Sequence, residues 1–124
     1  MNELRIAATK TSPEILLNPG GMIRIRGRSV HENALEFFKP VDDWVNDYIN
    51  EPADVTSIDI HLDYINSANA KILTQLIQKI SRVRLLNKKL IINWYYEEGD
   101  EDIHERGEYF SSALNIPFNF VKAD

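Results

Sequence analysis

Alternation of apolar and polar residues, together with one β-rich segment and one short last segment, predicts five strands along the chain. The clearest strand covers residues 55–65, in which apolar side chains share one face and polar side chains share the other. Residues 22–26 also alternate strictly, and we expect a hairpin turn at 18–21 before them and an end at Gly27. The other predicted strands are 4–7, 90–96 and 117–121. The apolar face of 55–65 consists of Ile58, Ile60, Leu62 and Tyr64.

Apolar residues at helical spacing predict the helices between these strands. The longest helix is expected to run from Ser67 to about Leu86, and another from Glu101 to Leu114 after an acidic loop. Residues 29–32 have the S-x-x-E form of a capping box, and Pro40 lacks the N–H that a continuous helix requires. We therefore expect a short helix at 31–38 and a second at 40–49. The apolar stripe of the longest helix consists of Ile72, Leu73, Leu76, Ile77, Ile80 and Val83.

The order of the elements is β-β-α-β-α-β-α-β, which favours an α/β fold with helices connecting parallel strands. Two strands carry polar faces, Arg24 with Arg26 on one and residues 59, 61 and 63 on the other. Because polar faces need water, we expect a mixed sheet of about five strands with helices mainly on one face. A length of 124 residues predicts a single domain, 1–124.

Composition argues against several classes of protein, including nucleic-acid-binding, membrane-spanning and disulfide-containing proteins. The net charge of −5 argues against binding to nucleic acid or to an anionic membrane surface. No segment has the ~18 consecutive apolar residues of a membrane span, and the first ten residues lack the apolar stretch of a signal peptide. The chain contains no cysteine, so it has no disulfide, thiolate metal site or thiol nucleophile. These features fit a cytoplasmic protein.

Two clusters that contain acidic residues are candidate ligand sites. Asp59, His61 and Asp63 share one strand face, where each is ~6.6 Å from the next, so a single ion would need further ligands from elsewhere. The other interpretation is a solvated face on which the acids pair with the two arginines of the neighbouring strand. The run around Asp100 lacks the spaced oxygen ligands and glycine of a calcium loop, and its acids suit the start of the next helix.

No catalytic motif is present. The chain has no phosphate-binding glycine loop, no G-x-G-x-x-G and no G-x-S-x-G turn. We expect a non-enzymatic protein with no catalytic residue, cofactor or metal. The alternative is a small enzyme or a metal- or ligand-binding protein that uses Asp59, His61, Asp63 and the acidic loop near Asp100.

Ser67 lies where the strand 55–65 passes into the longest helix, at the expected N-cap position. One interpretation is an ordinary capping serine, whose oxygen accepts from the free N–H groups of the first turn. The other is a regulatory phosphorylation site, because a phosphate there would meet free donors and the positive end of the helix dipole. Local chemistry alone favours the cap.

Three ordered blocks resemble one bacterial family. Residues 27–40 resemble the signature G-x-S-x-P-E-N…F-F-x-P, and residues 64–71 resemble Y-(F/L/I)-N-(S/T)-(S/A)-x-x-K. Residues 94–107 contain a third block, with W-Y-Y-E-E, D-E-D and E-x-G. Together they resemble the SiaC family of regulatory phosphoproteins, which is similar in fold to anti-sigma-factor antagonists (STAS domains).

The resemblance implies a cytoplasmic phospho-switch. A cognate Ser/Thr kinase would phosphorylate Ser67, a PP2C-type phosphatase would reverse this, and the unphosphorylated form would bind a diguanylate cyclase that promotes biofilm formation through c-di-GMP. Serine stands where the best-known member has threonine, and His31 where the first block usually has proline. The expected partner-binding residues around the phosphorylation site are Tyr64, Asn66, Ala68, Asn69 and Lys71.

Overall fold

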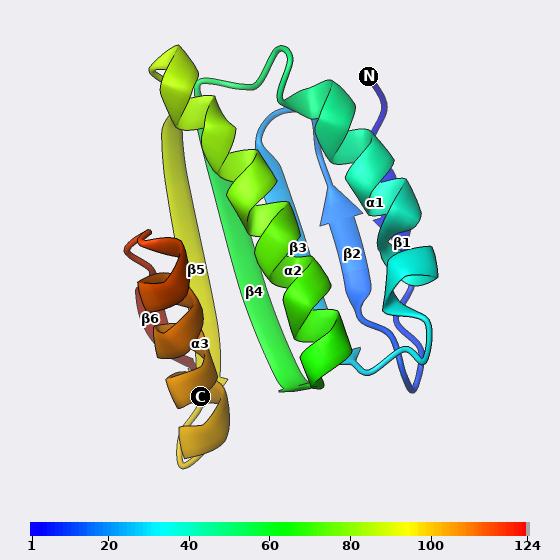
Figure 1. The fold of residues 1–124 in the computed structure, drawn as a ribbon, viewed down its shortest axis with the longest axis vertical. Helices are drawn as coiled ribbons and strands as arrows, with labels where there is room; N and C mark the ends of the chain where they lie inside the picture. Colours follow the sequence, from blue (N-terminus) through cyan, green and yellow to red (C-terminus); the bar gives the residue numbers. More distant parts are fainter. Residues whose placement is uncertain (124) are drawn as a thin grey trace.

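A six-stranded sheet with three α-helices on one face forms the framework of the described residues, and a short 3₁₀ helix follows the second α-helix (Figure 1). The computed structural model describes residues 1–123. The strands are β1 (Leu4–Ile6), β2 (Glu14–Leu17), β3 (Met22–Ser29), β4 (Val55–Ile65), β5 (Lys89–Glu97) and β6 (Asn119–Ala123). The helices are α1 (Ala34–Tyr48), α2 (Ser67–Ile80), the 3₁₀ helix η1 (Ser81–Leu86) and α3 (Glu101–Leu114).

The sheet is mixed, with strands in the order β1-β2-β3-β4-β5-β6. The β1–β2 and β2–β3 pairs are antiparallel, whereas β3, β4, β5 and β6 pair in parallel. A helix connects each successive parallel pair. The predicted α/β class, with a mixed sheet and helices mainly on one face, is confirmed.

The sixth strand, β2, was not predicted. Its sequence, Glu-Ile-Leu-Leu, places three buried side chains in succession, so it shows none of the alternation that marks a half-buried strand. The neighbouring strand β3 also differs from the prediction, because it does not end at Gly27. Gly27 adopts a φ of +120°, which suits glycine, and β3 continues past it to Ser29.

The first helix corrects two further expectations. The predicted capping box is wrong, because Ser29 belongs to β3 and the N-cap of α1 is Asn33, whose side chain accepts from the Glu36 amide. The predicted break at Pro40 is also wrong, since α1 is continuous through it. Pro40 has no N–H to donate to the Glu36 carbonyl. Both residues are exposed, so water can form the missing hydrogen bond to that carbonyl.

One hydrophobic core lies between the sheet and the helices. Trp94 of β5 is fully buried in it, and its Nε1–H donates to the Ile103 carbonyl of α3 at 2.9 Å. Gly107 allows this close packing, because a Cβ at that position would lie 2.5 Å from the Trp94 ring. None of the helices in residues 1–123 has the length and apolar character needed to cross a membrane.

Candidate functional site

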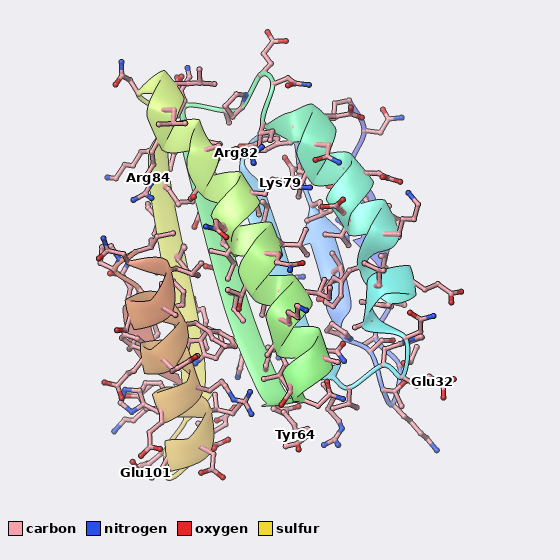
Figure 2. All side chains as sticks on the ribbon, viewed as in Figure 1. Glu32, Tyr64, Lys79, Arg82, Arg84 and Glu101 are labelled. Atoms are coloured by element: carbon pink, nitrogen blue, oxygen red, sulfur yellow. The ribbon has the colours of Figure 1, made fainter. Side chains whose placement is uncertain are left out.

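Ser67 lies at the end of the molecule where the parallel strands finish and the helices begin. Figure 2 shows Tyr64 and Glu101 at this end and the basic residues Arg82 and Arg84 at the other. We call the exposed side chains of Tyr64, Ser67, Ala68 and Lys71 the Ser67 surface. Strand β4 and helix α2 present them together, with one residue between the two elements.

A bulge at the end of β4 brings Tyr64 to the surface. The pairing with β3 passes from Gly27–Leu62 to Arg28–Tyr64 and skips Asp63, which reverses the alternation of β4. Tyr64 is therefore 50% exposed, whereas Ile65 is buried. The prediction that Tyr64 shares the buried face of β4 is wrong. The Arg28 guanidinium lies 5.6 Å from the Tyr64 ring centroid, a cation–π contact.

The N-cap of α2 is Asn66, one residue before the predicted cap at Ser67. The Asn66 side-chain oxygen accepts from the Asn69 amide at 3.0 Å, and Ser67 is the first residue of the helix. Within residues 1–123 the Ser67 hydroxyl has no hydrogen-bond partner, and the residue is exposed. Since Asn66 caps the helix, the capping interpretation of Ser67 no longer holds.

A buried polar network holds the start of α2 in place. Asn69 is fully buried, where it accepts from the Ser29 hydroxyl at 3.1 Å. Its side-chain amide donates to the His31 carbonyl at 3.1 Å and to the Asn66 side-chain oxygen at 2.7 Å. The expectation that Asn69 contacts a partner directly does not fit this burial. Its side chain instead positions the Ser67 surface from beneath.

His31, which stands where the family signature usually has proline, is accommodated without loss of the first helix. Its Nδ1 accepts from the Asn33 backbone amide at 3.0 Å, and its ring stacks on Phe37 with centroids 5.5 Å apart. Asn33 then caps α1. The entry into α1 is therefore ordered by contacts that a histidine can make.

Two grooves adjoin the Ser67 surface. The first, between α2 and α3, contains Ser67 and Lys71 on one wall and Arg106 and Tyr109 on the other. The second contains Arg106 and Tyr109 again, together with four carboxylates and the end of β4. Its acidic residues are Asp63, Asp100, Asp102 and Glu105. Arg106 and Tyr109 were not predicted, because the periodicity of α3 does not say which helix lies beside it.

The alternative site of Asp59, His61, Asp63 and Asp100 is not assembled. Asp59 accepts from the Asn93 side chain at 2.8 Å, and His61 Nε2 lies 3.1 Å from Glu97 Oε1. Asp100 caps α3 by accepting from the Ile103 amide at 3.1 Å. No group of three or more His, Cys, Asp or Glu side chains in residues 1–123 could hold a metal ion. Asp59 and His61 belong to a solvated sheet face, whereas Asp63 lies with Asp100 in the second groove, away from both.

The pairing predicted across this sheet face also differs in detail. Arg24 Nη2 pairs with Glu14 Oε1 of β2 at 3.2 Å, because β2, which was not predicted, lies beside β3. A hydrogen bond from Lys88 holds the pKa of Asp54 below its usual range, and hydrogen bonds from Arg5 and Asn18 do the same for Glu3.

Comparison with known proteins agrees with the sequence motifs. A family model described as "SiaC family regulatory phosphoprotein" matches residues 6–123. The chain is 25% identical over 119 residues to an uncharacterized protein of Pseudomonas aeruginosa (strain UCBPP-PA14), covering 95% of this chain and 94% of that protein.

Solved structures of similar fold come from the same organism. One is SiaC of Pseudomonas aeruginosa in complex with diguanylate cyclase SiaD, of which it is the activator, with a TM-score of 0.88 and 24% identity. The alignment covers 97% of this chain and 99% of that one. Another is apo-SiaC, with a TM-score of 0.86 and 24% identity, covering 98% of this chain and 99% of that one.

Proposed function

This chain belongs to the SiaC family of regulatory phosphoproteins, and from this premise we propose that it is a switch protein controlled by phosphorylation of Ser67. A cognate Ser/Thr kinase adds the phosphate and a PP2C-type phosphatase removes it. The unphosphorylated form binds and activates a diguanylate cyclase in the cytoplasm, which links the protein to c-di-GMP signalling and biofilm formation. The chain itself is a regulatory protein and not an enzyme.

The observation that carries this proposal is the state of the Ser67 side chain. It is exposed on the first residue of α2, and Asn66 already caps the helix. Substitution or modification of the Ser67 hydroxyl therefore removes no contact that the fold uses within residues 1–123. A hydroxyl that is accessible to a kinase and dispensable for folding is what a phosphorylation site requires.

Phosphorylation should change the surface and leave the fold intact. A phosphoserine carries about −1.5 to −2 charge, and a helix N-terminus favours negative charge. The first turn of α2 contains no acidic residue that would oppose it. A partner docked over the Ser67 surface would instead meet added bulk and a charge that must be desolvated.

The proposed contact surface consists of Tyr64, Ala68 and Lys71, with Asn66 at its edge. Tyr64 offers an exposed aromatic ring, a residue type enriched at binding hot spots. Asn69 supports this surface through its buried hydrogen bonds and does not itself contact the partner.

The proposal is tested first by mapping phosphosites by mass spectrometry on protein from its native cell, with and without the kinase. Ser67→Ala, Ser67→Asp and wild type are then used to capture binding proteins, and captured diguanylate cyclase is assayed for c-di-GMP synthesis with each purified variant. We expect wild type and Ser67→Ala to bind and activate the cyclase, and Ser67→Asp to do neither.

Ser112→Asp is the matched control, because Ser112 is also an exposed helical serine but lies near the end of α3. It should behave as wild type. Phosphate found only at other residues, or equal activation by Ser67→Asp and wild type, would overturn the proposal.

A further inference from the structure

On the basis of the proposed function, we propose that Arg106 binds the phosphate on Ser67 and so joins α3 to the start of α2 in the phosphorylated form. Ser67 and Arg106 line the same groove from opposite walls. No other arginine lines that groove, and Lys71 is the remaining cation in its lining. The proposal concerns how the switch holds its phosphorylated state.

Arg106 differs from the other partly buried cations of residues 1–123. Four lysine and arginine side chains are partly buried: Arg24, Lys79, Lys88 and Arg106. The first three each pair with a carboxylate, at 3.2, 2.6 and 2.8 Å respectively. Within the described part of the chain, Arg106 has neither an ion pair nor a hydrogen bond from its guanidinium.

The missing partner is not explained by a lack of nearby acids. Asp102 and Glu105 line the neighbouring groove together with Arg106, yet neither pairs with it. A partly desolvated cation without a direct ion pair or hydrogen bond is an unfavourable arrangement, which a suitably placed anion would relieve. Phosphorylation of Ser67 would supply that anion in the groove that Arg106 already lines.

The chemistry of the two groups is complementary. A guanidinium presents its N–H donors in a planar fork that matches two phosphate oxygens, and such charge-assisted pairs are among the stronger hydrogen bonds in proteins. Lys71 lies four residues after Ser67, on the same side of α2, and adds a second positive charge. Arg106 would thus hold the phosphate through directional hydrogen bonds, and Lys71 would add electrostatic attraction.

Binding of the phosphate would also change the second groove. Arg106 is the basic residue in that groove, whose other charged residues are acidic. If its guanidinium turns toward Ser67, the acidic groove loses its positive charge at the same time as the first groove is filled. One modification would thus alter both grooves that adjoin the Ser67 surface.

The test uses the full chain with phosphoserine installed genetically at position 67, so that no kinase is needed. The second pKa of the phosphate is measured by ³¹P NMR titration in wild type, Arg106→Gln and Arg106→Lys. Arg84→Gln is the matched control, because Arg84 is exposed at the opposite end of the molecule (Figure 2).

We expect wild type to hold the phosphate pKa roughly 0.5 to 1 below its ordinary value of about 6, because a nearby cation favours the dianion. Arg106→Gln should raise the phosphate pKa toward its ordinary value, leaving only the effect of Lys71 and the helix N-terminus, whereas Arg106→Lys should keep part of the Arg106 effect and Arg84→Gln should leave the wild-type pKa unchanged. A phosphate pKa that is equal in wild type and Arg106→Gln would overturn the proposal.

A second measurement covers the case in which Arg106→Gln does not fold. In wild type labelled with ¹⁵N-arginine, phosphorylation should slow the solvent exchange of one guanidinium N–H signal. If no guanidinium signal exchanged more slowly, the proposed contact would be overturned. Neither measurement involves the cyclase. A phosphoprotein that shows the Arg106 contact but binds the cyclase normally refutes the proposed function alone, and the reverse result refutes the contact alone.

Discussion

Replacing Asn66 with alanine should destabilise the protein far more than replacing its neighbour Ser67. The Asn66 side-chain oxygen accepts two hydrogen bonds from Asn69, one from the backbone amide and one from the buried side-chain amide. Loss of the cap costs about 1 kcal/mol, and loss of an acceptor for the buried amide costs about 1 kcal/mol more. We therefore expect Asn66→Ala to lower the free energy of unfolding by about 2 kcal/mol.

Ser67→Ala should change the free energy of unfolding by less than about 0.5 kcal/mol, as exposed substitutions away from special contacts usually do. Ser67→Asp should be neutral or slightly stabilising, by about 0.3 to 1 kcal/mol, because it places negative charge at a helix start. Asn66→Asp, which keeps a capping oxygen, should recover the cap contribution and serves as the control for Asn66→Ala.

The assay is urea unfolding followed by tryptophan fluorescence, which is suited to this chain because Trp94 is fully buried. At this chain length a loss of 2 kcal/mol corresponds to a fall in Tm of roughly 6 to 10 °C. Equal unfolding slopes for the variants would show that stability alone has changed. If Ser67→Ala lost 1 kcal/mol or more while Asn66→Ala was silent, Ser67 would be the cap and the reasoning from the structure would be refuted.

Three further outcomes are expected. Gly107→Ala should lower the free energy of unfolding by about 1 to 3 kcal/mol in the same urea assay, because the new Cβ would meet the Trp94 ring at 2.5 Å; an unchanged midpoint would contradict this close contact. Pro40→Ala should raise the free energy of unfolding by about 1 to 3 kcal/mol, because alanine restores an N–H that can donate to the Glu36 carbonyl. A fall in Tm would contradict this account of α1. Tyr64→Ala should fold normally but weaken cyclase binding roughly tenfold or more, measured by titration calorimetry, and an unchanged Kd would remove Tyr64 from the proposed surface.

Elements with strong local signals were predictable from sequence. The strand at 55–65 and the helix at 101–114 coincide with β4 and α3. The first has long alternation, and the second has a helical stripe after an acidic cap at Asp100. Both signals lie within the element itself and need no knowledge of its neighbours.

The predictions from sequence were wrong at β2 and at α1, where neighbouring elements determine the local structure. The strand β2 has three successive buried residues, and only its place between β1 and β3 makes it a strand. Helix α1 continues through Pro40 because Phe38 and Val41 are both buried against the core, and this packing outweighs one lost hydrogen bond. Periodicity within a segment does not contain this information.

The candidate site shows the same division. Its position, at the passage from β4 into α2, follows from the change of period at residues 65–67. The exposure of Tyr64 does not, because it depends on a bulge in the pairing between β4 and β3. The presence of Arg106 in the same groove as Ser67 depends on the packing of α3 next to α2, which no motif in either helix predicts.

The shift of the cap by one residue changes what the serine can be used for. Had Ser67 capped α2, phosphorylation would have removed a contact that the helix needs, and switching would have been coupled to fraying of the helix. The hydrogen bonds between Asn66 and the buried Asn69 instead stabilise the helix start, and the Ser29 hydroxyl links them to β3 by donating to Asn69. Ser67 is then free to be modified on a fixed framework. In the proposed switch, phosphorylation would change which partners can approach Ser67 while the fold beneath stays constant. The phosphorylated form should therefore be at least as stable as the unphosphorylated form and should differ strongly from it in affinity for the partner.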